Sequence, residues 1–149
     1  MQNVDWAVIA SDIDSHGYMT GIEREKSRIK ATAEVFTPTE VVVAILKEIP
    51  FEYLQPGKSV FDPACGDGQF LAGVLAVKLR FFEMTREAAL SEIYGVDILR
   101  DNVKLCKKRL GGGNIALGNS LNPTLEIVGQ TRRDKELLSK IFSDDDQLF

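Results

Sequence analysis

Residues 60–70, VFDPACGDGQF, decide the fold of this chain. Val60 and Phe61 end a buried apolar run that is typical of a strand, and a long apolar helix follows from Gln69. The turn between them contains Gly66 and Gly68, which can adopt main-chain angles barred to other residues and leave room for a ligand against the backbone. The helix behind the turn presents unpaired N–H groups and a partial positive charge. This arrangement predicts a nucleotide-like small molecule as the ligand.

Length and composition indicate one globular domain. The chain has 149 residues, of which 44% are hydrophobic and 27% are charged, enough for a core. No apolar run approaches the length of a membrane span, and the first residues lack the basic region and cleavage site of a secretory signal. We therefore expect a cytoplasmic protein with no membrane partner.

Charged and metal-binding residue types give no strong signal. The net charge of −4 does not favour nucleic-acid binding by the molecule as a whole, so a contact with DNA must be local. Basic residues cluster within residues 24–30, 104–109 and 132–135, and their mixing with acids is more typical of solvated helix faces. Cys65, Cys106 and a lone turn histidine, His16, fit no metal spacing, which predicts free thiols and no metal site.

The segment before the turn is predicted to be helical. Trp6, Ile9 and Ile13 have helical spacing, with Asn3 or Asp5 as the cap, and residues 22–32 form a charged helix. In the next helix Thr37 is predicted to be the cap, Pro38 to take the first position, and Glu40 to complete a capping box. Its apolar stripe consists of Val41, Val42, Ile45, Leu46 and Ile49.

Strands and helices alternate after the turn. We expect helices over residues 69–82, 101–110 and 132–142, a short helix capped by Thr85, and strands over residues 93–98 and 115–117. This alternation predicts an α/β fold with a parallel sheet and right-handed crossovers. We divide the chain into an N-terminal helical segment (1–33), an α/β core (34–121) and a C-terminal loop, helix and acidic tail (122–149).

The ligand of such a sheet lies at the carboxyl ends of its strands, so Gly66, Asp97 and Asn119 should converge there. Asp97 ends the second strand, where a carboxylate can accept hydrogen bonds from ribose hydroxyls, which indicates a nucleoside. NAD is the competing ligand, but the turn has only two of the three fingerprint glycines. Asp62 would also repel a pyrophosphate, so a ligand with a cation at that point fits better.

Two motifs carry a resemblance to a known family. Residues 62–71, DPACGDGQFL, resemble the S-adenosylmethionine motif of N6-adenine DNA methyltransferases, and Phe36-Thr37-Pro38 resembles the Phe-Thr-Pro motif that precedes it. Val96-Asp97 and residues 114–121 match the next two family segments, so the resemblance covers roughly residues 30 to 121. Short methylase-like proteins of tailed phages are also similar. The resemblance implies a truncated Rossmann-like methyltransferase fold. It also implies that S-adenosylmethionine is the cofactor.

The resemblance also implies roles for single residues. Thr37 and its backbone would hold the methionine carboxylate, Asp62 would face the methionine ammonium, and Asp97 would bind the ribose. Ile98 would pack on the adenine ring, and Asn119, where the family usually has Asp, would accept from the adenine amino group. Asp67 is expected to point to solvent. The implied cofactor-binding set is Phe36, Thr37, Pro38, Asp62, Pro63, Ala64, Gly66, Gly68, Phe70, Asp97, Ile98 and Asn119.

One family motif is missing. The Asn/Asp-Pro-Pro-aromatic segment, which holds the target adenine, has no counterpart; residues 122–125, NPTL, lack the second proline and the aromatic, so Asn122 is predicted to be a turn residue. We therefore assign no catalytic residue. Two functions remain: an adenine methyltransferase acting on DNA, alone or with a catalytic or target-recognition partner chain, or a non-catalytic subunit that binds S-adenosylmethionine and modulates a restriction-modification system.

The missing motif also affects the sheet. In the family the strand that ends at Asp62 is central, between the strand of Asp97 and a fourth strand that this chain lacks. An open strand edge exposes backbone groups that proteins cover. We therefore expect a homodimer, or else a cover formed by the helix over residues 132–142.

Overall fold

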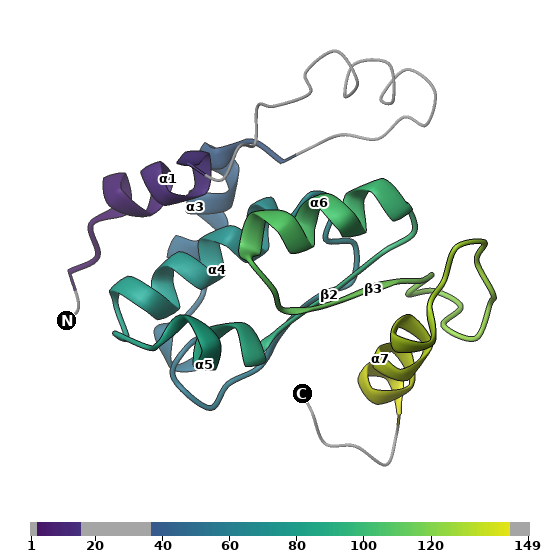
Figure 1. Cartoon of the computed structure of the whole chain (residues 1–149). Helices are drawn as coiled ribbons and strands as arrows, with labels where there is room; N and C mark the ends of the chain where they lie inside the picture. Colours follow the sequence, from purple (N-terminus) through teal and green to yellow (C-terminus); the bar gives the residue numbers. More distant parts are fainter. Residues whose placement is uncertain (1–2, 16–36, 144–149) are drawn as a thin grey trace.

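The computed structural model describes residues 3–15 and 37–143, and its centre is a parallel sheet (Figure 1). The strands β1 (Val60–Asp62), β2 (Ile93–Asp97) and β3 (Asn114–Leu117) lie in the order β1-β2-β3. Both strand pairs are parallel, with Asp62 opposite Gly95 and Asp97 opposite Leu117, so all three strands run in one direction. The α/β fold predicted from the alternation of strands and helices is confirmed, and it agrees with a truncated Rossmann-like methyltransferase sheet.

Helices cover both faces of the sheet (Figure 1). On one face α4 (Gln69–Arg80) and α6 (Arg100–Leu110) pack over Ile93, and on the other α7 (Arg132–Phe142) packs over Tyr94 and Val96. Neighbouring residues of a strand point to opposite faces, so β2 is buried from both sides. This explains why its sequence is almost continuously apolar.

The N-terminal helices α1 (Trp6–Ser15) and α3 (Thr39–Glu48) pack against α4. Their contact requires a glycine, because a Cβ atom at Gly73 would lie 2.8 Å from Leu46 and 2.9 Å from Val42. As predicted, α1 buries Ile9 and Ile13. The cap is Asp5, whose Oδ1 accepts a hydrogen bond from the Val8 N–H at 3.2 Å.

Two shorter helices complete the layer that contains α4. A 3-10 helix, η1 (Phe51–Tyr53), follows Pro50, and Phe51 packs edge-on against Phe81 with ring centroids 4.7 Å apart. Helix α5 (Arg86–Ser91) is capped by Thr85 as predicted, with the Ala88 N–H donating to Thr85 Oγ1 at 3.2 Å.

The prediction for the start of α3 is wrong. The helix begins at Thr39, Pro38 takes the cap position, and no side chain caps it. The predicted stripe is also too wide, since Val42 and Leu46 are fully buried but Val41 and Ile45 are 43% and 42% exposed. Helical spacing places the apolar residues of α3 on one side of the helix, but α1 and α4 cover only the part of that side on which Val42 lies.

Among the described residues β1 is an edge strand, as the missing fourth strand led us to expect, whereas the family pattern places it at the centre of the sheet. Within the described residues β2 is the central strand, and β1 pairs with β2 alone. Helix α7 lies on the sheet face rather than beside β1, and its Phe142 ring packs edge-on against Phe61 with centroids 5.7 Å apart.

Several expectations lie outside the described residues. They are the helix over residues 22–32, the basic cluster within residues 24–30, the turn at His16, and the cofactor-binding residue Phe36. In residues 3–15 and 37–143, none of the helices combines the length and the apolar character that crossing a membrane requires.

Candidate functional site

Hydrogen bonds donated by main-chain N–H groups hold the glycine turn in place. At its start the Ala64 N–H donates to Asp62 Oδ1 at 3.1 Å, and the Cys65 N–H donates to the Val96 carbonyl of β2 at 2.9 Å. Gly66 has φ +56° and Gly68 has φ +96°, which side-chain-bearing residues rarely adopt. This is the tight turn that the sequence predicted.

The two glycines serve different purposes. A Cβ atom at Gly68 would lie 2.9 Å from Cys106 Sγ, so Gly68 is needed for packing between the turn and α6. A Cβ atom at Gly66 would meet no heavy atom within 4 Å. The open space beside the backbone, where a ligand could lie, is therefore at Gly66.

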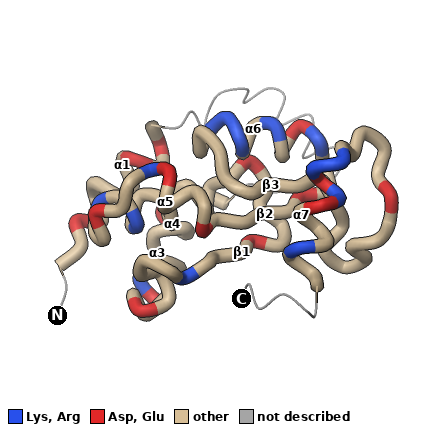
Figure 2. Tube along the Cα trace, turned by 60° about the horizontal axis from the view of Figure 1, so that its bottom comes forward, with Lys and Arg blue, Asp and Glu red and all other residues tan. Residues whose placement is uncertain are grey.

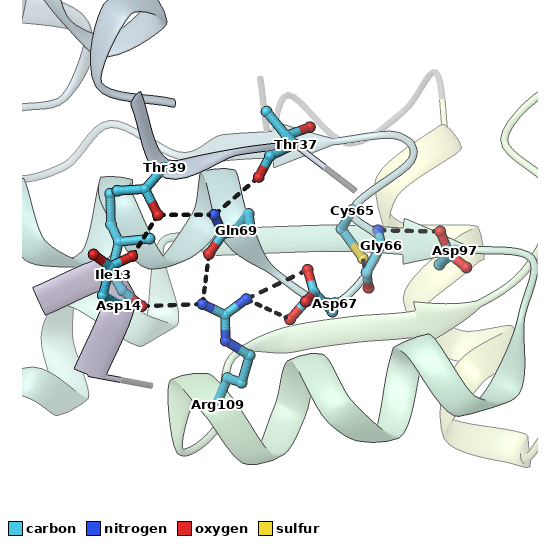
Figure 3. Close-up of polar contacts among 10 residues, drawn as sticks. All are labelled: Ile13, Asp14, Thr37, Thr39, Cys65, Gly66, Asp67, Gln69, Asp97 and Arg109. Carbon is cyan, nitrogen blue, oxygen red and sulfur yellow. Dashed lines mark hydrogen bonds and ion pairs between the residues drawn. The ribbon is translucent and has the colours of Figure 1, made fainter. Parts of the chain in front are cut away.

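Asp97 connects the turn to the end of β2. Its Oδ1 accepts from the Gly66 N–H at 3.1 Å (Figure 3). Its Oδ2 accepts from the Leu99 N–H and from Asn102 Nδ2, both at 3.0 Å. A carboxylate can accept about four hydrogen bonds, so this conformation leaves about one position, on Oδ1, for a ligand hydroxyl. The predicted approach of Gly66 and Asp97 is present.

The loop after β3 reaches the same edge of the sheet. Ser120 Oγ donates to the Pro63 carbonyl at 2.7 Å, which joins this loop to the glycine turn. Asn119 Oδ1 accepts from the Leu121 N–H at 2.9 Å, so Asn119 stabilises its own turn. The ends of all three strands therefore meet. Among the described residues, however, the Asn119 side chain forms no hydrogen bond with the glycine turn or with Asp97.

Asp62 is the electrostatically unusual group at this edge. Burial raises its pKa above the ordinary value of 3.8, the Ala64 N–H opposes this effect, and the nearby Asp97 carboxylate adds to it. A bound cation strongly stabilises the ionised form of a carboxylate that is poorly solvated and lies beside a second carboxylate. The site therefore fits a ligand that places an ammonium group at Asp62.

The two cysteines lie together. Contact with the Cys106 thiol, and then burial, raise the pKa of Cys65 well above its ordinary range. Both cysteines are free thiols, as the sequence predicted, and both are buried. The sequence did not indicate that they contact each other. Within the part of the chain that the structure describes, no group of three His, Cys, Asp or Glu side chains is arranged to hold a metal ion.

A buried ionic network behind the turn was not predicted. Arg109 of α6 is 5% exposed and Asp67 is 2% exposed, and Arg109 Nη1 lies 3.3 Å from Asp67 Oδ1 (Figure 3). The expectation that Asp67 points to solvent is therefore wrong, because the turn directs its side chain toward α6. Gln69, the first residue of α4, accepts from Arg109 Nη2 at 2.7 Å.

Helical spacing contained a sign of this network. Asn102, Cys106 and Arg109 are at helical spacing on α6, and all three are buried. Lys104, Lys107 and Lys108 are exposed, and basic residues mark the outer side of α6 (Figure 2). Reading residues 104–109 as a solvated basic cluster was therefore correct for the lysines and wrong for Arg109.

The remaining predicted cofactor residues surround the turn at varied depth. The Thr37 carbonyl accepts from Gln69 Nε2 at 2.9 Å. Ile98 is 54% exposed at the end of β2. Phe70 is half-buried against the core, whereas Pro38, Pro63 and Ala64 are exposed.

Two cavities are formed by other residues than those of the glycine turn. One of about 330 Å³ lies between residues 123–126 and α7, and another of about 590 Å³ is lined by Asp12, Arg80 and Arg86. Neither is lined by Asp62, Gly66 or Asp97. The candidate site is thus defined by the strand ends and the glycine turn.

Comparison with known proteins agrees with the motif resemblance. No solved structure matches the chain. The model of the family described as N-6 DNA methylase matches residues 19–135, which include the glycine turn, all three strands and the loop after β3. Since this match covers most of the 149 residues, the chain belongs to the N-6 DNA methylase family.

Proposed function

We propose that the protein binds S-adenosylmethionine at the carboxyl edge of its sheet and takes part in methylation of adenine in DNA. The observation that carries the proposal is the arrangement at the ends of β1 and β2, where the Gly66 N–H donates to Asp97 and the Asp62 carboxylate lies close enough to Asp97 to be affected by its charge. Membership of the N-6 DNA methylase family supports a DNA-methyltransferase-like function for the chain.

The residues at this edge suit the parts of such a cofactor. S-adenosylmethionine supplies a methyl group on a positively charged sulfur. Asp62 would pair with the ammonium of the methionine portion, and Gly66 would allow the ligand to lie against the main chain. Asp97 Oδ1 would accept from a ribose hydroxyl, and the exposed Ile98 would cover one face of the adenine ring.

The part of the site that would hold the target adenine has no counterpart in the described residues. Asn122 is exposed in a turn, where its N–H donates to the Asn119 carbonyl at 3.0 Å and its carbonyl accepts from the Leu125 N–H at 3.0 Å. The lone pair of an adenine amine is delocalised into the ring, so methyl transfer requires hydrogen bonds that hold the amine in line. We therefore propose that a partner chain supplies this positioning.

Cofactor binding is tested by calorimetry with a pair of glycine variants. S-adenosylmethionine and its demethylated product should bind in preference to NAD and ATP. Gly66→Ala and Gly57→Ala both place a Cβ atom at positive φ, +56° and +93°, with no heavy atom within 4 Å. Both should lose about 1–2 kcal/mol of stability, but only Gly66→Ala should weaken binding, by about tenfold or more.

Equal affinity for NAD would contradict the proposed ligand. Unchanged affinity in Gly66→Ala would contradict the proposed site, since Gly57 lies in the turn before β1, at the opposite end of that strand. The comparison separates a local effect on the ligand from a general loss of stability.

Activity is tested by incorporation of tritiated methyl groups into unmethylated duplex DNA. The purified chain alone should show slow incorporation or none, and a partner that carries an Asn-Pro-Pro-aromatic segment should restore it. Multiple turnovers by the chain alone, abolished in Asp62→Ala, would show that the chain contains its own acceptor site.

A non-catalytic cofactor-binding subunit is the second candidate function, and the absence of the Asn-Pro-Pro-aromatic motif from the sequence favours it. Cofactor binding without incorporation in the presence of that partner would support this candidate.

A second copy of the chain is the alternative partner, because β1 pairs with β2 alone among the described residues. Sedimentation of the purified protein distinguishes a homodimer from a monomer.

A further inference from the structure

The buried side chain of Arg109 contacts three separate parts of the chain. Its Nη1 donates to the Asp67 carbonyl at 3.2 Å, and its Nη2 donates to the Ile13 carbonyl at 3.2 Å and to Gln69 Oε1 at 2.7 Å. One guanidinium group from α6 thus joins the glycine turn, the first residue of α4 and the end of α1 (Figure 3).

Gln69 extends these contacts to the segment before α3. Its Nε2 donates to the Thr37 carbonyl at 2.9 Å and lies 3.3 Å from Thr39 Oγ1. The Thr39 hydroxyl in turn donates to Asp14 of α1. Arg109 and Gln69 therefore connect the glycine turn to the residues around Thr37, although Gln69 and Thr37 are 32 positions apart along the chain.

Stability alone does not account for this network. A buried ion pair is often no more stabilising than apolar side chains of similar volume, because desolvation of both charges offsets their attraction. The planar guanidinium does, however, fix several acceptors in one geometry, which a lysine ammonium or an apolar side chain cannot do. The network is thus better suited to holding two segments in a defined relative position.

We infer that Arg109 and Gln69 are positioning residues. They hold the glycine turn and the Thr37 segment in the relative position that binds the methionine end of the cofactor. This inference rests on the proposed function. Neither side chain needs to touch the ligand: Arg109 fixes the turn through Asp67, and Gln69 fixes the Thr37 carbonyl. Loss of either contact should leave the strands in place and loosen the site.

The chain contains a matched control. Lys78 is also a fully buried cation, and its Nζ donates to the carbonyls of Leu54 and Lys58 at 3.1 and 3.0 Å and pairs with Glu92 at 2.7 Å. Glu92 directly precedes β2, so this network lies at the amino end of the sheet, opposite the candidate site. Arg109→Met and Lys78→Met each remove one buried cation and leave one carboxylate.

The experiment measures the affinity of the folded variants for the demethylated cofactor product by calorimetry. Arg109→Met should bind at least tenfold more weakly than the wild type, and Lys78→Met should stay within twofold. Gln69→Glu keeps an acceptor for Arg109 but removes the donor to the Thr37 carbonyl, and should weaken binding at least fivefold. If Arg109→Met does not fold, Asp67→Asn combined with Arg109→Met removes both charges and should show the same loss.

A second measurement needs no ligand. In nuclear magnetic resonance spectra of the cofactor-free chain, the Gly66 and Gly68 amide signals should shift in Arg109→Met and stay in place in Lys78→Met. Wild-type affinity in Arg109→Met, equal losses in both methionine variants, or unmoved glycine signals would overturn the inference. Failure of the wild type to bind would instead overturn the proposed function, and the glycine signals would still decide the positioning role.

Discussion

Replacing Asp62 by Asn should separate stability from cofactor binding. Asn keeps the Oδ1 atom that accepts from the Ala64 N–H at 3.1 Å, so the turn is preserved while the charge is removed. A charged hydrogen bond contributes on the order of 1.5–3 kcal/mol, so Asp62→Asn should bind S-adenosylmethionine roughly 10- to 150-fold more weakly. Calorimetry measures this loss.

The same substitution should stabilise the cofactor-free protein at neutral pH. Burial raises the pKa of Asp62 in the folded chain above 3.8, its ordinary value, so the ionised form is less favoured in the folded chain than in the unfolded one. The stability that this group contributes is fully present below its unfolded pKa and is lost as the pH rises through its folded pKa. The advantage of Asp62→Asn should therefore grow across that interval and then stay constant.

Urea unfolding between pH 3 and pH 8 measures the stability difference. Glu48→Gln, which removes an exposed charge at the end of α3, is the control and should change neither property. Wild-type affinity in Asp62→Asn would refute the pairing of Asp62 with the ammonium group. A loss of stability at neutral pH would refute the reasoning about its burial.

Three further outcomes are expected. Gly68→Ala should cost about 2–4 kcal/mol in urea unfolding, from strain at φ +96° and from a Cβ atom 2.9 Å from Cys106 Sγ; a cost below about 1 kcal/mol would contradict this packing. Cys65 should react slowly with a thiol reagent at pH 8 until urea is added, because contact with Cys106 and burial raise its pKa; fast labelling of the folded chain would contradict it. Thr131→Ala should lower stability by about 1 kcal/mol through loss of the α7 capping box, and Asp134→Ala should cost more, since Asp134 also accepts from a β3 amide at 3.2 Å; equal losses would show that this second contact contributes nothing.

The sequence by itself determined the type and the order of the strands and of the α-helices that the structure describes, though not the 3-10 helix η1. Helix α7 has the predicted bounds, 132–142, and Thr85 caps α5 as predicted. These features depend on apolar spacing, caps and glycines within a few residues of each other, so local sequence contains the needed information. The meeting of Gly66 and Asp97 followed as well, because parallel strands bring their carboxyl ends to one edge.

Other local signals were overridden by contacts with distant residues. Thr37 has the residue type and spacing of a helix cap, yet its carbonyl accepts from Gln69 and α3 begins two residues later. Val41 belongs to the apolar stripe by spacing and is exposed, because the width of a buried face depends on which helices pack against it. Neither outcome is visible within the segment itself.

Only the tertiary structure decided which charged residues are buried. Arg109 is one of several basic residues on α6, and Asp67 is one acid in a glycine turn, 42 positions earlier in the chain. Lys78 likewise lies in an apolar helix, and it forms an ion pair with Glu92, which follows the next helix in the chain. Periodicity states which residues share a helix face, but a charge can be buried only where a partner from elsewhere in the fold offsets its desolvation, and that partner is set by the packing of the whole chain.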